Sequence, residues 1–208
     1  MQVDASATSS TGSIGGRTSQ PTPSVACLDS GVDDCYRVQE VARDLGAVQD
    51  LVAAPDGRVF LIDGSRRVRV VSDGVLAPGA ALSVDPDTTA LVSLAIGPDF
   101  ASTRRVFVGS VERWPDGRRE FFVHRYREVE GTLGEGAAII SGLPVAADRR
   151  VPIALDAGGF IYVALPGVDG HLAGRSAFAY NGQVLRFSPD GSTPPDQSSV
   201  AFAPAYRE

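Results

Sequence analysis

The sequence predicts an all-β fold of the β-propeller type, with about three four-stranded antiparallel blades. From residue 48 onward one pattern recurs: a strand, a turn rich in Pro, Asp or Gly, a second strand, another turn and a third strand. Equivalent turns begin at Ala54, Gly97 and Asp156, and these intervals are typical of propeller blades with a variable insertion. The 23 Gly and 14 Pro residues among 208 also favour short strands over long helices. The three copies cover residues 48–74, 91–131 and 151–170, and the third continues into residues 182–191.

Side-chain type predicts the individual strands. Residues 58–62 and 67–71 are β-branched or aromatic runs, and the second run alternates apolar with charged residues. Residues 160–164 are apolar throughout, as expected of a strand covered on both faces. Three Asp-Gly pairs predict hairpin turns, because glycine accepts a positive φ at little cost. These pairs are Asp56-Gly57, Asp116-Gly117 and Asp190-Gly191.

The beginning of the chain differs in composition from the rest. Residues 1–24 are rich in Ser, Thr and Gly and predict a disordered tail, ahead of a partial propeller domain over residues 25–208. The tail as given lacks the basic start and the apolar stretch of a signal peptide. Cys27 and Cys35 enclose a short acidic loop. They suit either a redox pair or a local disulfide in an exported protein, and we favour the disulfide.

Composition excludes several classes of function. The formal net charge of −6 is a poor match for a nucleic-acid-binding protein. All 19 basic residues are Arg, so lysine Schiff-base and P-loop chemistry are excluded in this chain. The spacing of its two His and two Cys residues suggests no metal cluster. Apolar runs are too short for a membrane-spanning helix, which needs about 20 residues.

Four segments resemble the soluble quinoprotein glucose/sorbosone dehydrogenase family, also called aldose sugar dehydrogenases, which depend on pyrroloquinoline quinone (PQQ). The segments are LVAAPDGRVFLIDGSRRVRVVSDG, LAIGPDFASTRRVFVGSVE, IALDAGGFIYVALPG and GQVLRFSPDGSTPPD. The resemblance covers about residues 38–196. It implies half of a six-bladed propeller, in which the complete ring holds PQQ over a central channel with calcium as a further cofactor.

The resemblance also decides between two interpretations of residues 36–46. Val38, Val41 and Leu45 have helical spacing and Gly46 is a helix-stop residue, so the local pattern favours a short helix. The propeller makes the same segment an extended strand leading into the first blade, and we favour the strand.

The catalytic base of the family does not carry over to this sequence. The family's base is a His in a His-x-Gly-Gly motif before the third of these segments, and that motif falls on residues 148–151. Asp148 occupies the His position and neither glycine is present. His171 and Asn181 lie in a loop that in the family runs near the cofactor, so they are the candidate cofactor-binding residues, with an ordinary surface or turn role as the alternative.

We therefore expect a partial propeller that is not catalytic by itself and is completed by another chain, a second copy or further residues. One alternative is an exported propeller that binds a protein or glycan through its loops. The other is PQQ-dependent sugar oxidation in a complete assembly, with Asp148 replacing the His. PQQ and calcium rest on the resemblance alone. The expected location is periplasmic or extracellular.

Overall fold

A computed structural model describes residues 24–27, 35–38, 40–148, 150–168 and 180–196. The chain divides into two compact units, Met1–Glu40 and Val41–Glu208. Within the first unit, the strands β1 (Ser24–Cys27) and β2 (Cys35–Val38) pair antiparallel. Nearly all of the predicted tail lies outside the described residues.

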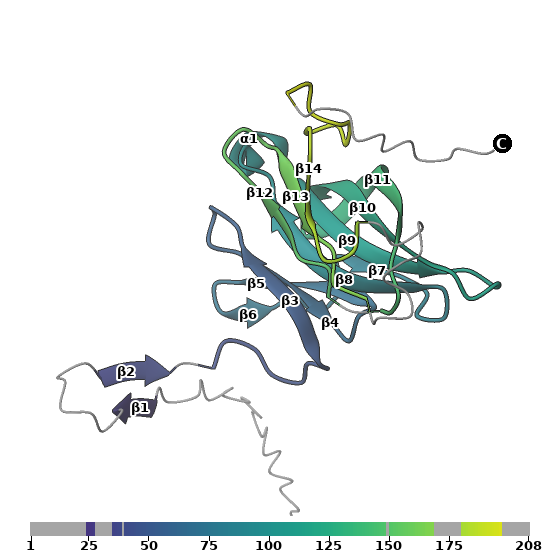
Figure 1. Cartoon of the computed structure of the whole chain (residues 1–208). Helices are drawn as coiled ribbons and strands as arrows, with labels where there is room; N and C mark the ends of the chain where they lie inside the picture. The colour runs from purple at the N-terminus through teal and green to yellow at the C-terminus, as the bar shows by residue number, and fades with distance from the viewer. Residues whose placement is uncertain (1–23, 28–34, 39, 149, 169–179, 197–208) are drawn as a thin grey trace, which may run out of the picture. The chain divides into compact units, whose positions relative to one another are not determined.

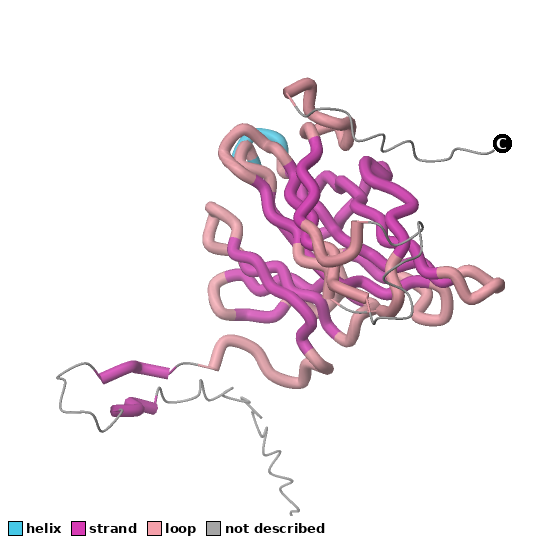
Figure 2. The backbone as a smooth tube through the Cα atoms, viewed as in Figure 1, coloured by secondary structure: helices cyan, strands magenta, loops and turns pink. Residues whose placement is uncertain are grey.

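Three antiparallel sheets make up the second unit (Figure 1). The first sheet contains β3 (Val48–Ala53), β4 (Val59–Asp63), β5 (Arg67–Ser72), β6 (Val75–Leu76) and β7 (Leu82–Ser83). The second contains β8 (Thr89–Ile96), β9 (Arg105–Arg113), β10 (Arg119–Val129) and β11 (Thr132–Pro144). The third contains β12 (Ile153–Leu155), β13 (Ile161–Ala164) and β14 (Val184–Phe187). One short helix, α1 (Phe100–Thr103), stands beside these strands (Figure 2).

The sheets are arranged as propeller blades. In each sheet, neighbouring strands follow one another along the sequence. The first strands of the three sheets are β3, β8 and β12. Both β3 and β12 contact β8, so the first strands of the three sheets lie together while later strands lie farther out. The predicted all-β, propeller-like architecture is confirmed, and the sheets form an open arc rather than a closed ring.

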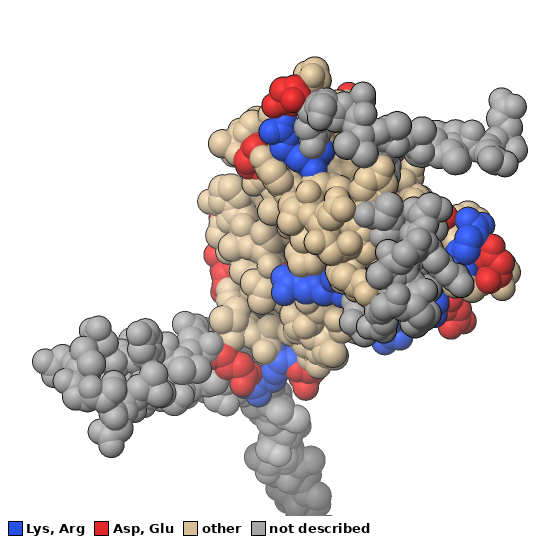
Figure 3. All heavy atoms as spheres, viewed as in Figure 1, with Lys and Arg blue, Asp and Glu red and all other residues tan. Residues whose placement is uncertain are grey.

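The predicted Asp-Gly turns are present in all three sheets. In each turn the aspartate carboxylate accepts a hydrogen bond from the backbone N–H two residues later, at 3.0–3.2 Å. The following glycine has a φ of 85° or 86°, in the region that other residues adopt only with strain. These turns therefore place acidic side chains at the ends of strands, and on the face shown in Figure 3 the acidic groups lie toward the borders. The glycines are Gly57, Gly117 and Gly191.

Other elements differ from the expectation. Among the described residues of the segment 36–46, the strand β2 ends at Val38, and residues 40–47 are irregular rather than helical or extended into the first blade. Asp63 explains part of this, because its carboxylate accepts the Gly46 N–H at 2.7 Å and holds the segment against β4. Strand β11 was not apparent in the sequence, where its three glycines interrupt the apolar pattern.

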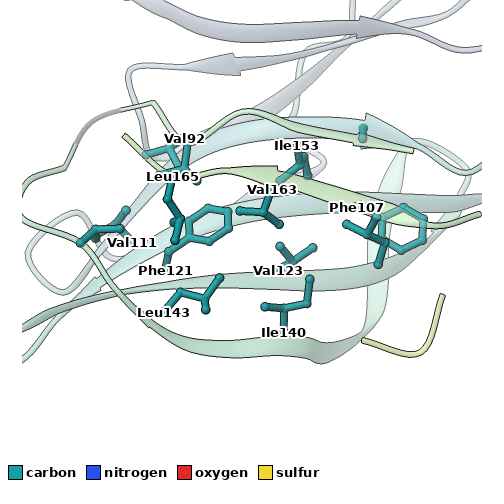
Figure 4. Packing of buried hydrophobic residues seen from close by; sticks show 14 of the residues in the cluster. Val92, Phe107, Val111, Phe121, Val123, Ile140, Leu143, Ile153, Val163 and Leu165 are labelled. Carbon is teal, nitrogen blue, oxygen red and sulfur yellow. The ribbon is translucent and has the colours of Figure 1, made fainter. Parts of the chain in front are cut away.

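Packing between sheets buries both faces of the second sheet. Phe60, Ile62 and Val68 of the first sheet pack against one face of the second. On the opposite face, Phe121 and Val123 pack against Ile153, Val163 and neighbouring residues of the third sheet (Figure 4). Burial of this apolar surface is the main term that holds the blades together, at roughly 25 cal/mol per Å².

The two terminal sheet faces are more polar than these buried faces. On the first sheet, Asp63 is buried and pairs with Arg67 at 2.8 Å on the side away from the second sheet. On the third sheet, Tyr162 donates a hydrogen bond to Asp156 at 3.2 Å. Exposed apolar side chains nevertheless remain at both ends of the arc, since Leu51 is 61% exposed and Val184 is 67% exposed.

A polar tie joins the first two sheets at their outer part. The guanidinium of Arg58, next to β4, donates two hydrogen bonds of 2.7 Å to the carboxylate of Glu128 on β10. Glu128 is only 4% exposed. The guanidinium carbon of Arg58 also lies 5.5 Å and 5.8 Å from the ring centres of Phe60 and Phe100, a cation–π arrangement. Arg58 lowers the pKa of Glu128, so this carboxyl is ionised at neutral pH.

Replacing Glu128 with Gln tests this tie. Glu128→Gln removes the charge that faces Arg58, and we expect the free energy of unfolding in urea to fall by about 2 kcal/mol. Glu135→Gln is the matched control, because Glu135 is exposed and its nearest Arg nitrogen lies 3.9 Å away. Equal effects of the two substitutions would contradict a stabilising role for the tie.

A comparison of wild type with Glu128→Gln also predicts how stability depends on pH. Because the folded-state pKa of Glu128 is lowered, its contribution is present above the unfolded-state pKa of about 4.3 and is lost as pH falls through the folded-state pKa. The difference in unfolding free energy between wild type and Glu128→Gln should therefore shrink as pH is lowered from 6 toward about 3.

Candidate functional site

The first strands of the three sheets meet around one carboxylate. Asp50 on β3 accepts a hydrogen bond from the backbone N–H of Leu94 on β8 at 2.9 Å and another from Arg150, just before β12, at 2.7 Å. The Asp50 side chain is 9% exposed, whereas that of Arg150 is 59% exposed. We call Asp50, Arg150 and the Leu94 amide the axial node, because they join all three sheets at their innermost strands.

A β-bulge explains how Asp50 reaches this position. The pairing of β3 with β4 shifts between Val48 and Leu51, so β3 carries one more residue than its partner there. Such a bulge leaves a residue outside the regular ladder and redirects its side chain. Asp50 lies in the bulge and bonds across to β8 and to Arg150.

Asp148, the residue at the family's base position, lies elsewhere. Its carboxylate forms ion pairs with Arg113 at 2.8 Å and with Arg119 at 3.2 Å, the residues that flank the β9–β10 hairpin. Arg113 also donates a hydrogen bond to the backbone carbonyl of Pro86. Asp148 therefore fastens the loop before β12 to the second sheet. Two residues later, Arg150 is the side chain of this loop that reaches the axial node.

The candidate cofactor-binding residues are not brought together in the described structure. The side-chain amide of Asn181 donates to the carbonyl of Pro144, at the end of β11, at 3.1 Å. Its Oδ1 is buried and has no hydrogen-bond partner among the described residues. His171 lies outside the described residues. Asn181 therefore contacts the outer strand of the second sheet rather than the axial node.

The described residues do not form a complete quinone site. PQQ carries carboxylates, so its recognition calls for guanidinium or other cationic donors. The Arg113 and Arg119 side chains already pair with Asp148, and Arg150 pairs with Asp50. The unpaired group of Asn181 is an oxygen, which cannot donate to a carboxylate. Within the described ranges, no cluster of three or more His, Cys, Asp or Glu side chains is suited to hold a metal ion.

One cavity, with a volume of about 450 Å³, adjoins the Arg58–Glu128 tie. Its charged groups neutralise one another: Asp56 pairs with Arg58 at 2.9 Å and with Arg104 at 2.8 Å. Arg58 also lowers the pKa of Asp56. This cavity is therefore part of the contact between the first two sheets. None of the helices in the described part of the chain is long and apolar enough to cross a membrane.

Solved structures with a similar fold include sugar dehydrogenases. A Thermus thermophilus oxidoreductase described as a glucose dehydrogenase is 21% identical with a TM-score of 0.61, and the match covers 76% of this chain and 49% of that one. The soluble aldose sugar dehydrogenase of Escherichia coli is 18% identical with a TM-score of 0.62, over 76% and 49% of the two chains. The PQQ domain of Coprinopsis cinerea pyranose dehydrogenase is 12% identical with a TM-score of 0.56, over 83% and 39%.

These similarities show a common fold. At such identities they do not establish a shared activity. The chain spans about half the length of the Thermus and E. coli proteins. No protein-family sequence model and no curated protein matches the chain. The family resemblance in the sequence is thus confirmed at the level of the fold.

Sequence reasoning missed the axial node. Asp50 follows Val48-Gln49 at the start of a predicted strand, where a charged residue suits an exposed position equally well. The bulge that redirects the Asp50 side chain arises from the pairing between β3 and β4, and no local sequence pattern predicts it. Arg150 could be found from the sequence, since it stands within the four residues aligned with the family motif, whereas the His position of that motif falls on Asp148.

Substitutions at the axial node separate its two contacts. Asp50→Asn weakens both hydrogen bonds of a mostly buried carboxylate, and we expect the free energy of unfolding in urea to fall by about 2 kcal/mol. Arg150→Ala removes one exposed partner and should change it by less than about 1 kcal/mol. An effect of Arg150→Ala as large as that of Asp50→Asn would contradict a node organised around the Asp50 carboxylate.

Proposed function

We propose that this chain forms three blades of a sugar-dehydrogenase-type propeller and does not oxidise sugars by itself. The observation that carries this proposal is the match to about half of each sugar dehydrogenase, over three sheets arranged radially around β3, β8 and β12. The described residues supply three sheets in an open arc, so any group that the other half of such a ring contributes to its centre is not among them.

The free faces of the arc support completion by further blades. The sheet faces that lie between two neighbouring sheets are buried, whereas Leu51 on the first sheet and Val184 on the third sheet stay exposed. A second copy of the chain, another polypeptide or further residues that contribute propeller blades would cover these residues. We propose that such blades close the ring and that the assembly lies in the periplasm or outside the cell.

The chemistry at Asp148 argues against catalysis by this chain alone. A base that takes a proton from a sugar hydroxyl must bring an acceptor atom within hydrogen-bond reach of that hydroxyl. The two oxygens of Asp148 each accept a hydrogen bond from an Arg side chain. These two ion pairs hold the Asp148 carboxylate against the residues that flank the β9–β10 hairpin, so Asp148 is better suited to fixing the loop than to replacing the family's His.

A second candidate function is an exported propeller module that binds a glycan or protein through its loops. The β9–β10 hairpin favours it, because Trp114 at its end is 41% exposed and the Arg118 guanidinium lies 5.3 Å from the centre of its ring. An exposed indole offers a flat apolar surface on which a sugar ring or an apolar side chain can stack. This role needs no quinone.

Reconstitution tests the absence of activity. Purified protein supplied with PQQ, calcium, glucose and an artificial electron acceptor should reduce the acceptor no faster than PQQ and calcium without protein. The soluble aldose sugar dehydrogenase of E. coli, treated in the same way, controls for the assay. Acceptor reduction above the protein-free rate would overturn the proposal, and Asp148→Asn would then show whether that activity depends on the Asp148 carboxylate.

Light scattering tests completion of the ring. We expect the purified protein to have a mass above that of one chain, and we expect Leu51→Asp to lower it because a charge on the free face of the first sheet opposes burial. Glu135→Gln, on an exposed strand position of the second sheet, is the control. The proposal that further blades complete the ring would be contradicted if the protein stays fully folded as a monomer and binds no other chain with propeller blades.

A further inference from the structure

The two cysteines of the chain lie directly opposite each other in a two-stranded hairpin. In the pairing of β1 with β2, Ser24 faces Val38 and the register ends with Cys27 facing Cys35. These are the only cysteines in the sequence. Residues 28–34 connect the two strands, so the cysteine pair stands where the ladder ends and the connection begins.

This register matches the geometry of a disulfide. Directly opposed residues of antiparallel strands share a face of the sheet, and their Cα atoms lie about 4.5 Å or 5.5 Å apart, depending on the type of pair. Disulfides join residues whose Cα atoms are about 4.4–6.8 Å apart. Both types of pair fall within this range, so the backbone of the hairpin need not move for the two residues to be bridged.

We propose that Cys27 and Cys35 form an intramolecular disulfide that holds the β1–β2 hairpin closed. The two thiols lose two protons and two electrons as the S–S bond forms. The electron acceptor is a small-molecule disulfide such as oxidised glutathione, which is reduced to two thiols by exchange through a mixed disulfide. The inference is independent of the proposed function, because the three sheets of the second unit contain no cysteine.

The hairpin has a physical need for such a link. Each of its strands has four residues. An isolated two-stranded hairpin of this size is marginally stable in water, because its few backbone hydrogen bonds barely offset the entropy of ordering the chain. Cross-linking the two strands restricts the unfolded hairpin and so favours the paired state.

Peptide mapping of the full chain tests the bond. The protein is equilibrated with a mixture of oxidised and reduced glutathione, alkylated and digested with trypsin. Cleavage after Arg17 and Arg37 releases one peptide that holds both cysteines. We expect it to escape alkylation, to be lighter than the dithiol peptide by two hydrogen atoms, and to take up two alkyl groups only after reduction.

A second digestion distinguishes the connectivities. Cleavage before Asp29, Asp33 and Asp34 separates Cys27 from Cys35, so an intramolecular bond leaves two different fragments joined until reduction. Alkylation of both cysteines without reduction would overturn the proposal, as would Cys27–Cys27 or Cys35–Cys35 linked fragments from two chains.

Native proteolysis tests the effect on the hairpin. Arg37 lies on β2 opposite Val25, so opening of the hairpin should expose it to trypsin. We expect cleavage after Arg37 to be severalfold faster in Cys27→Ser and Cys35→Ser than in the oxidised protein. Cleavage after Arg118, in the β9–β10 hairpin of the second unit, is the internal control and should not change. Equal rates after Arg37 in all three proteins would overturn the role assigned to the bond.

Discussion

The structure depends on the burial of both faces of its central sheet. The second sheet has long strands with apolar side chains on both sides, so it is stable in water only between two other sheets. This requirement fixes the order of the three sheets around it and brings β3, β8 and β12 together. It also fits the shorter strands and the polar groups on the free faces of the flanking sheets, since each of them is covered on one side only by the described residues.

Hydrophobic contact between sheets has little directional preference, so polar ties define how the sheets are aligned. The axial node connects the innermost strands, and the Arg58–Glu128 pair connects the first two sheets farther out. Each uses both oxygens of a poorly exposed carboxylate, and a buried carboxylate without partners is strongly destabilising. Sliding of one sheet along its neighbour would break these bonds, whereas apolar contacts would only be exchanged for similar ones.

Local sequence was sufficient to predict the fold class and most of the strands, because alternation and Asp-Gly turns act over a few residues. The turn at Gly117 was predicted on this basis and is present. The strand predicted at 160–164 is present as Ile161–Ala164, but the expected burial of both faces was wrong, since Ile161 and Val163 are buried whereas Tyr162 and Ala164 are only half-buried. Strand β11 was missed because its pairing with β10, rather than its own glycine-containing sequence, makes it a strand. The axial node could not be predicted, because Asp50 and Arg150 are a hundred residues apart in sequence and meet only when three sheets have packed.

The loop before β12 shows how a propeller can keep its scaffold while its centre changes. The resemblance implies a His and two glycines at residues 148–151, where small residues let the backbone approach a ligand closely. In this chain the same loop has Asp148 paired with two Arg side chains of the second sheet and Arg150 paired with Asp50. At the position where the family places its base, these ion pairs instead help to align the sheets. The apolar packing between the sheets is retained, and the loop itself contributes the buried side chains Val145 and Val151 to it. Fold and catalytic chemistry are therefore separable here, and a good structural match to sugar dehydrogenases is compatible with the absence of their base.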